Sequence, residues 1–282
     1  MTSSLLFNVT TFAYLISMVL FFAFLASRSK AIGTGGSLAA YAGFIAQTIA
    51  IGLRWKESYD LGHGHAPLSN LYESVVFFSW TIILIFGILD MKYKYRIIGA
   101  FVIPFALLGM AWAQLGLASG IEPLVPALQS NWLLYHVITC FLGYACFAVA
   151  CGISIMYLIK IKSESADSNS AAGGVVSMFP SARILDDMNY RAIMIGFPLL
   201  TLGIITGAAW ANYAWGTYWS WDPKETWSLI TWIIYAIYLH ARFVKGWSEK
   251  RLAYISCFGF LCVLFTYWGV NLLLSGLHSY GR

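Results

Sequence analysis

Eight long apolar runs, separated by short polar connections, account for most of this chain of 282 residues. A helix that crosses a lipid bilayer needs about 20 predominantly apolar residues, and each run approaches or exceeds that length. The pattern predicts an all-α, polytopic membrane helical bundle with about eight transmembrane helices, in which residues 1–282 form a single integral membrane domain. The predicted spans cover roughly residues 5–27, 36–53, 71–90, 97–117, 132–160, 192–211, 226–243 and 252–275.

The basic residues indicate which connections face the cytoplasm or stroma. All but four of the 17 Lys and Arg residues lie in or beside the connections that follow the first, third, fifth and seventh runs. The positive-inside rule therefore places both termini on the outer side, which is periplasmic or lumenal. The four exceptions are Arg54, Lys56, Lys224 and Arg282.

The composition agrees with a membrane protein and explains the net charge. Only 10% of the residues are charged, whereas soluble domains carry about 25%. Because the formal charge of +5 follows membrane topology, we expect contact with membrane lipid and no nucleic-acid partner. The first apolar run can span a bilayer and lacks a basic leader, so no cleaved signal peptide is expected.

Three further features predict no chemistry. Residues 163–182 are rich in Ser, Ala and Gly, which is typical of a flexible loop, here cytoplasmic or stromal. From Pro180 the sequence predicts a short amphipathic helix that leads into the sixth span. The five cysteines lie in apolar runs without a CxxC pair, so we expect buried thiols that pack as small hydrophobic groups.

The most unusual stretch is AWGTYWSWDPKETW, at residues 214–227 between the sixth and seventh spans. Haem is a flat, apolar disc, and stacked indole rings offer it a binding platform. The alternative is an aromatic belt, since tryptophan is enriched at membrane interfaces, but a belt explains the crowding of tryptophans in this loop poorly. We predict an outer haem-binding loop over residues 210–227. Its platform would be Trp210, Trp215, Trp219, Trp221 and Trp227.

The carboxylates of this stretch have a structural explanation. In DPKE, Asp222 is an N-cap, proline follows at the first helical position and Glu225 stands at the third, which is a capping box that opens the seventh span. Asn70 and Glu73 repeat the device at the third span. Asp222 and Glu225 are therefore expected to be structural first, with haem contact added to that role, and no catalytic residue is predicted.

Two histidines near the outer surface are candidate ligands of haem iron. His136 and His278 lie at the same depth beside tryptophan-rich loops, and two imidazoles across a cleft can hold haem iron from both axial sides. For each of them alone, a polar tip at the level of the lipid headgroups is the alternative.

The remaining three histidines have different interpretations. His240 lies roughly 20 Å along its helix from Trp227, and an ionisable group inside a span is typically functional. It would be a second haem ligand, completed by a partner subunit, or a snorkelling residue near the inner border. His63 and His65 form an HxH pair that could be a metal clip, a substrate contact or loop polarity.

Longer stretches around these residues resemble a known family. WGTYWSWDPKETWSLITWIIYAIYLHAR resembles the tryptophan-rich WWD signature of haem-handling proteins in cytochrome c maturation. PLSNLYES and NLLLSGLHSYG resemble the CcsA (ResC) type of the system II pathway. The resemblance extends from about residue 60 to residue 282. The CcmC type has fewer spans and the CcmF type is much larger, so the chain is more similar to the CcsA type.

The resemblance implies specific roles. His136 and His278 match the two outer axial ligands, and His240 matches the transmembrane histidine whose companion belongs to a CcsB (ResB) subunit. Together the two subunits would export haem b and attach it to the CxxCH motif of apocytochrome c, as a cytochrome c synthase or haem lyase. The site would face the periplasm of a bacterial cytoplasmic membrane or, as an alternative, a thylakoid lumen. His63 and His65 match no family ligand.

Two other functions stay open on the residues alone. A transmembrane b-type cytochrome would transfer electrons, but it would place two facing histidine pairs within one chain. A solute transporter with an aromatic gate would typically show inverted repeats and broken helices, and no such symmetry is visible. A haem absorption band and a dependence on apocytochrome c distinguish the three.

Overall fold

The computed structural model describes residues 2–166, 174–244, 246–274 and 276, and all regular structure in these ranges is helical. The predicted all-α membrane bundle is confirmed. The helices are α1 (Ser3–Ser27), α2 (Lys30–Asp60), α3 (Leu71–Tyr93), α4 (Gly99–Gly116), α5 (Asn131–Ala166), α6 (Ala182–Trp215), α7 (Pro223–Phe243), α8 (Glu249–Leu264) and α9 (Val270–Leu273). Short 3₁₀ turns η1 (Arg96–Ile98), η2 (Pro126–Leu128) and η3 (Val175–Met178) and a π-helical turn η4 (Phe265–Gly269) complete the described chain.

Seven helical segments in the described chain are long and apolar enough to cross a membrane, which makes this a multi-pass membrane protein. The last of them, Glu249–Leu273, is built from α8, η4 and α9 in succession. The helix that falls short is α7, because its Trp, Tyr, Ser, Thr and His residues lower its hydropathy. Length and composition thus support seven spans where the sequence predicted about eight, and α7 is an additional, more polar helix of the same bundle.

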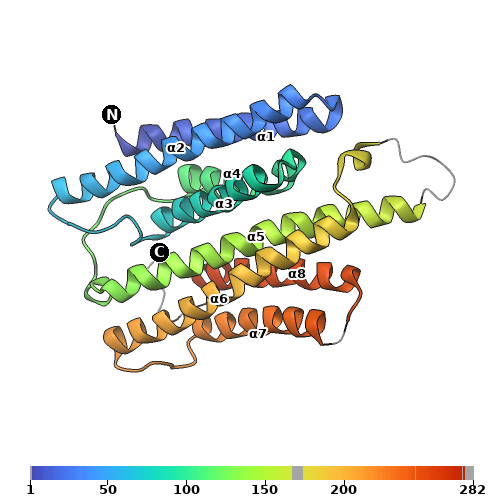
Figure 1. Ribbon diagram of the computed structural model, residues 1–282. Helices are drawn as coiled ribbons and strands as arrows, with labels where there is room; N and C mark the ends of the chain where they lie inside the picture. Colours follow the sequence, from blue (N-terminus) through green and yellow to red (C-terminus); the bar gives the residue numbers. More distant parts are fainter. Residues whose placement is uncertain (1, 167–173, 245, 275, 277–282) are drawn as a thin grey trace.

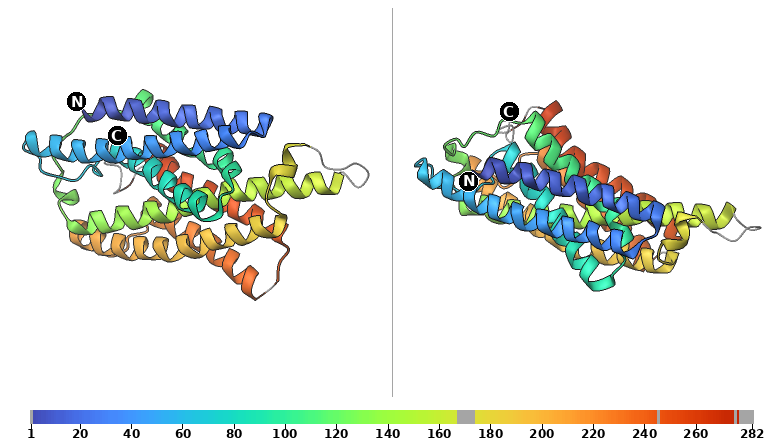
Figure 2. Two further views of the ribbon diagram at one scale, coloured as in Figure 1. Left: turned by 45° about the horizontal axis from the view of Figure 1, so that its top comes forward. Right: turned by 90° about the horizontal axis from the view of Figure 1, so that it is seen from above.

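The long helices form two groups of four that lie side by side (Figure 1). In the first group α1 packs along α2 and α4, and α3 packs along α4. In the second, α5 packs along α6 and α8, and α7 packs along α8. Helix α5 joins the groups through its contacts with α3 and α4, and Figure 2 shows it running through the middle of the bundle. In the most apolar window of α5, 78% of residues are buried, against 22% for α1, so the core is centred on α5.

The connections gather at two opposite ends of the bundle (Figure 1). One end carries the start of α1 and the connections α2–α3, α4–α5 and α6–α7. We call it the outer end, after the side of the membrane that the charge pattern predicts. The other end, which we call the inner end, carries the connections α1–α2, α3–α4 and α7–α8. The stretches with unusual composition therefore share one end, as the alternating charges predict.

Two predicted boundaries differ from the observed helices. Helix α5 continues to Ala166 and η3 forms at Val175–Met178, so the predicted flexible loop 163–182 is partly helical; its residues 167–173 lie outside the described part of the chain. The short helix expected from Pro180 is continuous with the sixth span and forms the 34-residue α6. Both extensions project beyond the apolar runs, where composition alone does not mark a helix end.

Polar contacts at the inner end hold α7 to its neighbours. Arg242 of α7 pairs with Asp186 of α6 at 2.5 Å and lies over the ring of Tyr190. The amide of Asn189 donates to the hydroxyl of Tyr238 at 3.3 Å. These contacts compensate for the lower apolar content of α7 and fix which of its faces points into the bundle.

Candidate functional site

The predicted haem-binding loop is mostly helical. Helix α6 continues through Trp215 and ends at Gly216, whose positive φ of 76° forms a left-handed cap that favours glycine. Helix α7 begins at Pro223. The irregular part is the stretch 216–222, which we call the α6–α7 loop. The five predicted tryptophans therefore sit on three different elements.

The predicted capping box is present and ties this loop to α7. One Asp222 carboxylate oxygen accepts from the backbone N–H of Lys224 at 2.9 Å. The Glu225 carboxylate accepts from the backbone N–H groups of Ser220 at 2.7 Å and Asp222 at 3.2 Å. Both carboxylates are buried. They satisfy amides that would otherwise lack partners at the helix start, and they fix the loop's position.

Trp210 packs on His136, and Trp215 packs on Trp210. Trp210 is buried, and its indole N–H donates to the carbonyl of Ala127 at 2.8 Å. Its ring stacks on the imidazole of His136 with centroids 6.0 Å apart and an interplanar angle of 19°. Trp215 packs on Trp210 with centroids 5.0 Å apart. Trp210 thus orients the imidazole.

The other three tryptophans have separate environments. Trp219 lies in the α6–α7 loop, half-buried and edge-on to Trp221 with centroids 5.7 Å apart. Trp221 is 68% exposed and has a φ of 61°, an uncommon conformation for a bulky residue and one that clusters at functional sites. Trp227 packs on Phe265 of η4. Only Trp219 and Trp210 line the cavities described below.

His136 is held in a defined tautomer. Its Nδ1–H donates to the carbonyl of Gly203 at 2.7 Å, so the ring lone pair lies on Nε2, the nitrogen suited to coordinate a metal. The thiol sulfur of Cys140, one turn further along α5, lies 3.6 Å from the same Nδ1. A Cβ added at Gly207 of α6 would come within 2.6 Å of Nδ1. The close approach of α5 and α6 therefore requires glycine at this position.

Two adjoining cavities meet at this part of α5. The first, of about 140 Å³, lies between α5, the start of α3 and α9, and we call it the α3 cavity. The second, of about 60 Å³, lies between α5, α6 and the α6–α7 loop, and we call it the α6 cavity. Each is smaller than a typical small-molecule site of about 300–1,000 Å³. The residues common to both walls are His136, Cys140, Tyr144 and Lys224.

Lys224 is the cation of this shared wall. It precedes the apolar part of α7, and its ammonium donates to the side-chain carbonyl of Asn271 at 3.1 Å. Burial lowers the pKa of Lys224 to about 8, because desolvation disfavours the charged form. Asn271 follows η4 and donates to the carbonyl of Tyr267. Such π-helical turns often occur at functional sites, and this one directs Tyr267 and Asn271 to the α3 cavity.

Of the other two predicted iron ligands, His278 lies outside the described residues. Gly276, two positions before it, lies against Asp222, where an added Cβ would collide with the carboxylate. His240 is in the last turn of α7, at the inner end of the bundle, with an exposed side chain.

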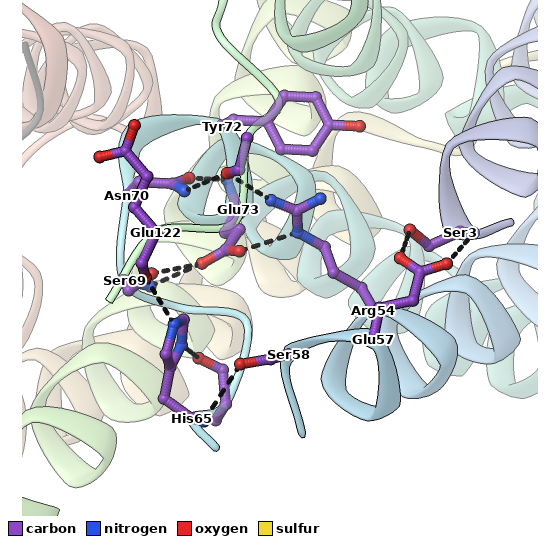
Figure 3. Close-up of polar contacts among 12 residues, drawn as sticks. Ser3, Arg54, Glu57, Ser58, His65, Ser69, Asn70, Tyr72, Glu73 and Glu122 are labelled. Carbon is purple, nitrogen blue, oxygen red and sulfur yellow. Dashed lines mark hydrogen bonds and ion pairs between the residues drawn. The ribbon is translucent and has the colours of Figure 1, made fainter. Parts of the chain in front are cut away.

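His65 belongs to a polar network at the start of α3 (Figure 3). His65 is buried, and its two ring nitrogens contact the backbone carbonyls of Ala66 at 3.1 Å and Glu122 at 2.9 Å. His63 stacks on it. Among the described residues no group of three or more His, Cys, Asp or Glu side chains is arranged to hold a metal ion. For His65 the loop-polarity interpretation fits these contacts.

The same network contains a buried ion pair. The Arg54 guanidinium pairs with the Glu73 carboxylate at 2.8 Å, with side chains 5% and 1% exposed, and also donates to the carbonyl of Gly120. Glu73 accepts further bonds from the backbone and hydroxyl of Ser69. Asn70 caps α3 by accepting from the Glu73 amide, as predicted. These contacts hold the α2–α3 connection in place beside the α3 cavity.

The cysteines agree with the prediction of buried thiols. Four are buried and Cys257 is half-buried, and all five are free. Cys140 differs from the others by its contact with His136. Sequence reasoning did not single out Cys140, Lys224, Asn271 or the glycines of α6. The one available signal was the lysine inside the DPKE capping box.

The family model described as "Cytochrome C assembly protein" matches residues 68–278. The chain belongs to this cytochrome c assembly family. It is 42% identical to the cytochrome c biogenesis protein CcsA of Guillardia theta over 97% of this chain and 95% of the relative. It is 39% identical to CcsA of Trieres chinensis over 100% of this chain and 96% of the relative. It is thus a CcsA-type cytochrome c biogenesis protein, as the sequence motifs suggest.

A solved structure shares the fold. The chain superposes on the cytochrome c heme lyase CcmF with a TM-score of 0.72, over 98% of this chain at 16% identity. This chain spans 48% of the length of that protein. At this identity the match establishes the helical arrangement alone.

Proposed function

We propose that this chain holds haem b at its outer end and presents it to apocytochrome c, as the CcsA-type subunit of a two-component haem exporter and cytochrome c synthase. The observation that carries the proposal is His136. Its Nδ1–H is bound to Gly203, its ring stacks on Trp210, and it forms part of a wall between two cavities. An imidazole oriented through Nδ1 has Nε2 set to coordinate iron.

Haem iron would be held from both axial sides by His136 and His278. The contact of Gly276 with Asp222 supports this pairing, because it brings the chain just before His278 to the α6–α7 loop. Trp219 on that loop lines the α6 cavity and offers an apolar face to the macrocycle. Asp222 and Glu225 would act indirectly, by fixing the loop through the capping box.

Covalent attachment would require little chemistry from the protein. Each thiol of the CxxCH motif adds across one haem vinyl group, so that sulfur bonds to the inner vinyl carbon and hydrogen goes to the terminal carbon. The addition consumes no oxidant or reductant, although the iron and the thiols must be in their reduced state. The histidine of CxxCH would displace one axial ligand. The contribution of this chain is therefore positioning of the two reactants, and no catalytic residue is proposed.

Haem would reach the outer site from the inner half of the bundle. His240 at the inner end of α7 points away from the bundle, which supports a site shared with a histidine of a CcsB-type subunit. We place the outer end in the periplasm of a bacterial membrane or in a thylakoid lumen, following the charge pattern. The names of the CcsA relatives and of the CcmF heme lyase support the assignment to cytochrome c biogenesis.

The test uses the complex with its CcsB-type subunit, expressed together with an apocytochrome c. His136→Ala and His278→Ala should abolish holocytochrome formation and change the Soret band of the purified complex, and His240→Ala should reduce the bound haem. His63→Ala, a histidine of the same outer end that lines neither cavity, is the matched control.

Normal maturation of cytochrome c in both His136→Ala and His278→Ala would contradict axial ligation. A wild-type complex without any haem band would favour the transporter interpretation. Haem that is retained through turnover and does not respond to apocytochrome c would favour a b-type cytochrome.

A further inference from the structure

Lys224 is a half-buried cation that forms no direct ion pair within the described part of the chain. Its ammonium is hydrogen-bonded to the neutral amide of Asn271, and no described carboxylate lies within ion-pairing distance. A charge removed from water is costly unless it is paired. A lysine in this position is typical of a site that is completed by an anionic ligand.

The two carboxylates of the capping box accept from backbone donors, and the charge of Asp222 also raises the pKa of Lys224, which partly opposes the effect of burial. The oxygens of Glu225 accept from the backbone of Ser220 and Asp222. Asp222 accepts from the backbone N–H of Lys224 and lies against Gly276. The capping box therefore uses these acids to hold the backbone, and it leaves the ammonium directed to Asn271.

The position of Lys224 relative to His136 suggests which anion it binds. Both residues line both cavities, so the cation and the candidate iron ligand belong to one wall. Haem carries its iron at the centre of the ring and two propionate carboxylates at one edge. If His136 coordinates the haem iron, the propionate carboxylates are the anionic groups of haem that can reach this wall. An ion pair with a carboxylate would also reverse the effect of burial, which lowers the pKa of Lys224.

We propose that Lys224 binds one haem propionate and thereby fixes the rotation of the macrocycle about the bond between iron and His136. The inference rests on the proposed haem site and adds its orientation. The vinyl groups lie on other pyrrole rings than the propionates, so a fixed propionate determines where the vinyl groups meet the apocytochrome thiols. Lys224 is a positioning residue and Asn271 holds its ammonium.

The experiment compares two porphyrins on the haem-depleted complex of this chain and its CcsB-type subunit. The probes are iron protoporphyrin IX and its dimethyl ester, which has the same ring, iron and vinyl groups without the two carboxylates. Wild type should bind the free acid about tenfold or more tightly than the ester. Lys224→Met should weaken binding of the free acid by about tenfold and leave binding of the ester unchanged.

Two variants complete the design. Lys224→Arg keeps the charge and should retain the preference for the free acid, which also covers the case in which Lys224→Met does not fold. Lys56→Met removes an exposed lysine from the same end of the bundle, paired with Asp60, and should bind both probes like wild type.

Each outcome is decisive. Equal weakening of both probes by Lys224→Met would show a structural role and overturn the proposal, as would affinities identical to wild type. Loss of the preference in Lys224→Arg would overturn it as well. A wild-type complex that binds neither probe with a Soret band sensitive to His136→Ala would instead overturn the proposed function, and this inference with it.

Discussion

Two helices that start at the outer end beside the cavities, α3 and α7, begin with a similar device, an N-cap side chain followed by a glutamate at the third position, but differ in the partner of the adjacent cation. Asn70 and Asp222 cap their helices, and Glu73 and Glu225 each accept bonds from the backbone just before the cap. At α3 the glutamate is also paired with a buried arginine. At α7 the lysine next to the glutamate is bound to a neutral amide at the cavity wall.

The partner of the cation therefore distinguishes the two regions. The start of α3 is a structural scaffold, whereas the start of α7 is a candidate site. Around α3 the charges of Arg54 and Glu73 neutralise each other, and the network in Figure 3 holds the α2–α3 connection in place. Around α7 the carboxylates hold the loop and the cation is hydrogen-bonded to Asn271, and we propose that it binds a haem propionate. A capping motif alone thus carries no information about function, whereas the partner of the adjacent charge does.

The largest effect is expected from breaking the scaffold. Glu73→Leu leaves the Arg54 guanidinium buried without its counterion, which should lower the free energy of unfolding by about 3–5 kcal/mol. The measurement is thermal and denaturant unfolding in detergent. The double variant Arg54→Met/Glu73→Leu should recover most of the loss, and Asp60→Asn, in an exposed pair, should change little. Equal destabilisation in the single and double variants would show that pairing is not the cause.

A smaller effect, concentrated on the site, is expected from Gly207→Ala. The added Cβ would meet His136 within 2.6 Å, so the imidazole must leave its bond to Gly203, at a cost of about 1–3 kcal/mol. Haem content and the Soret band of the purified complex should change. Gly52→Ala is the matched control, because its Cβ meets nothing within 4 Å. An unaltered haem spectrum in Gly207→Ala would be incompatible with the assigned role of His136.

The smallest effect is expected from removing the caps. Asn70→Ala and Asp222→Ala should each lower stability by about 1 kcal/mol, because each loses one N-cap bond. Only Asp222→Ala should also shift the haem spectrum, since it frees the loop that carries Trp219. Asp222→Asn keeps a capping oxygen and should restore stability. If Asn70→Ala shifted the spectrum as strongly as Asp222→Ala, the division between scaffold and site would fail.

Much of the architecture was predictable because it depends on local pattern. Apolar runs of spanning length give the membrane helices, and the DPKE and Asn70–Glu73 signatures give two helix starts. The helix ends at Ala166 and Trp215 were not predictable, because these helices continue beyond the apolar runs. The polar character of α7 is tolerated because Arg242 and Tyr238 bind to α6, a contact that no local pattern contains.

The candidate site was predictable only in part. His136 stood out by its depth and its aromatic surroundings, and the structure gives it Trp210 and Gly203 as neighbours. The axial role of His136, the pairing with His278 and the role of His240 stay predictions. The five tryptophans of the predicted platform lie on three elements, because α6 extends further than the run of apolar residues indicates, and their contact with haem stays a prediction.

The sequence by itself determined the class of the protein, the family, the helix starts and the side on which unusual residues gather. These follow from hydropathy, charge alternation and capping, which act over a few residues. Only the tertiary structure decided that His136, Cys140 and Lys224 share one wall, because that depends on how closely α5 approaches α6 through glycines and where η4 turns Asn271. Contacts between distant helices are set by packing, and packing is not encoded in any single stretch of the chain.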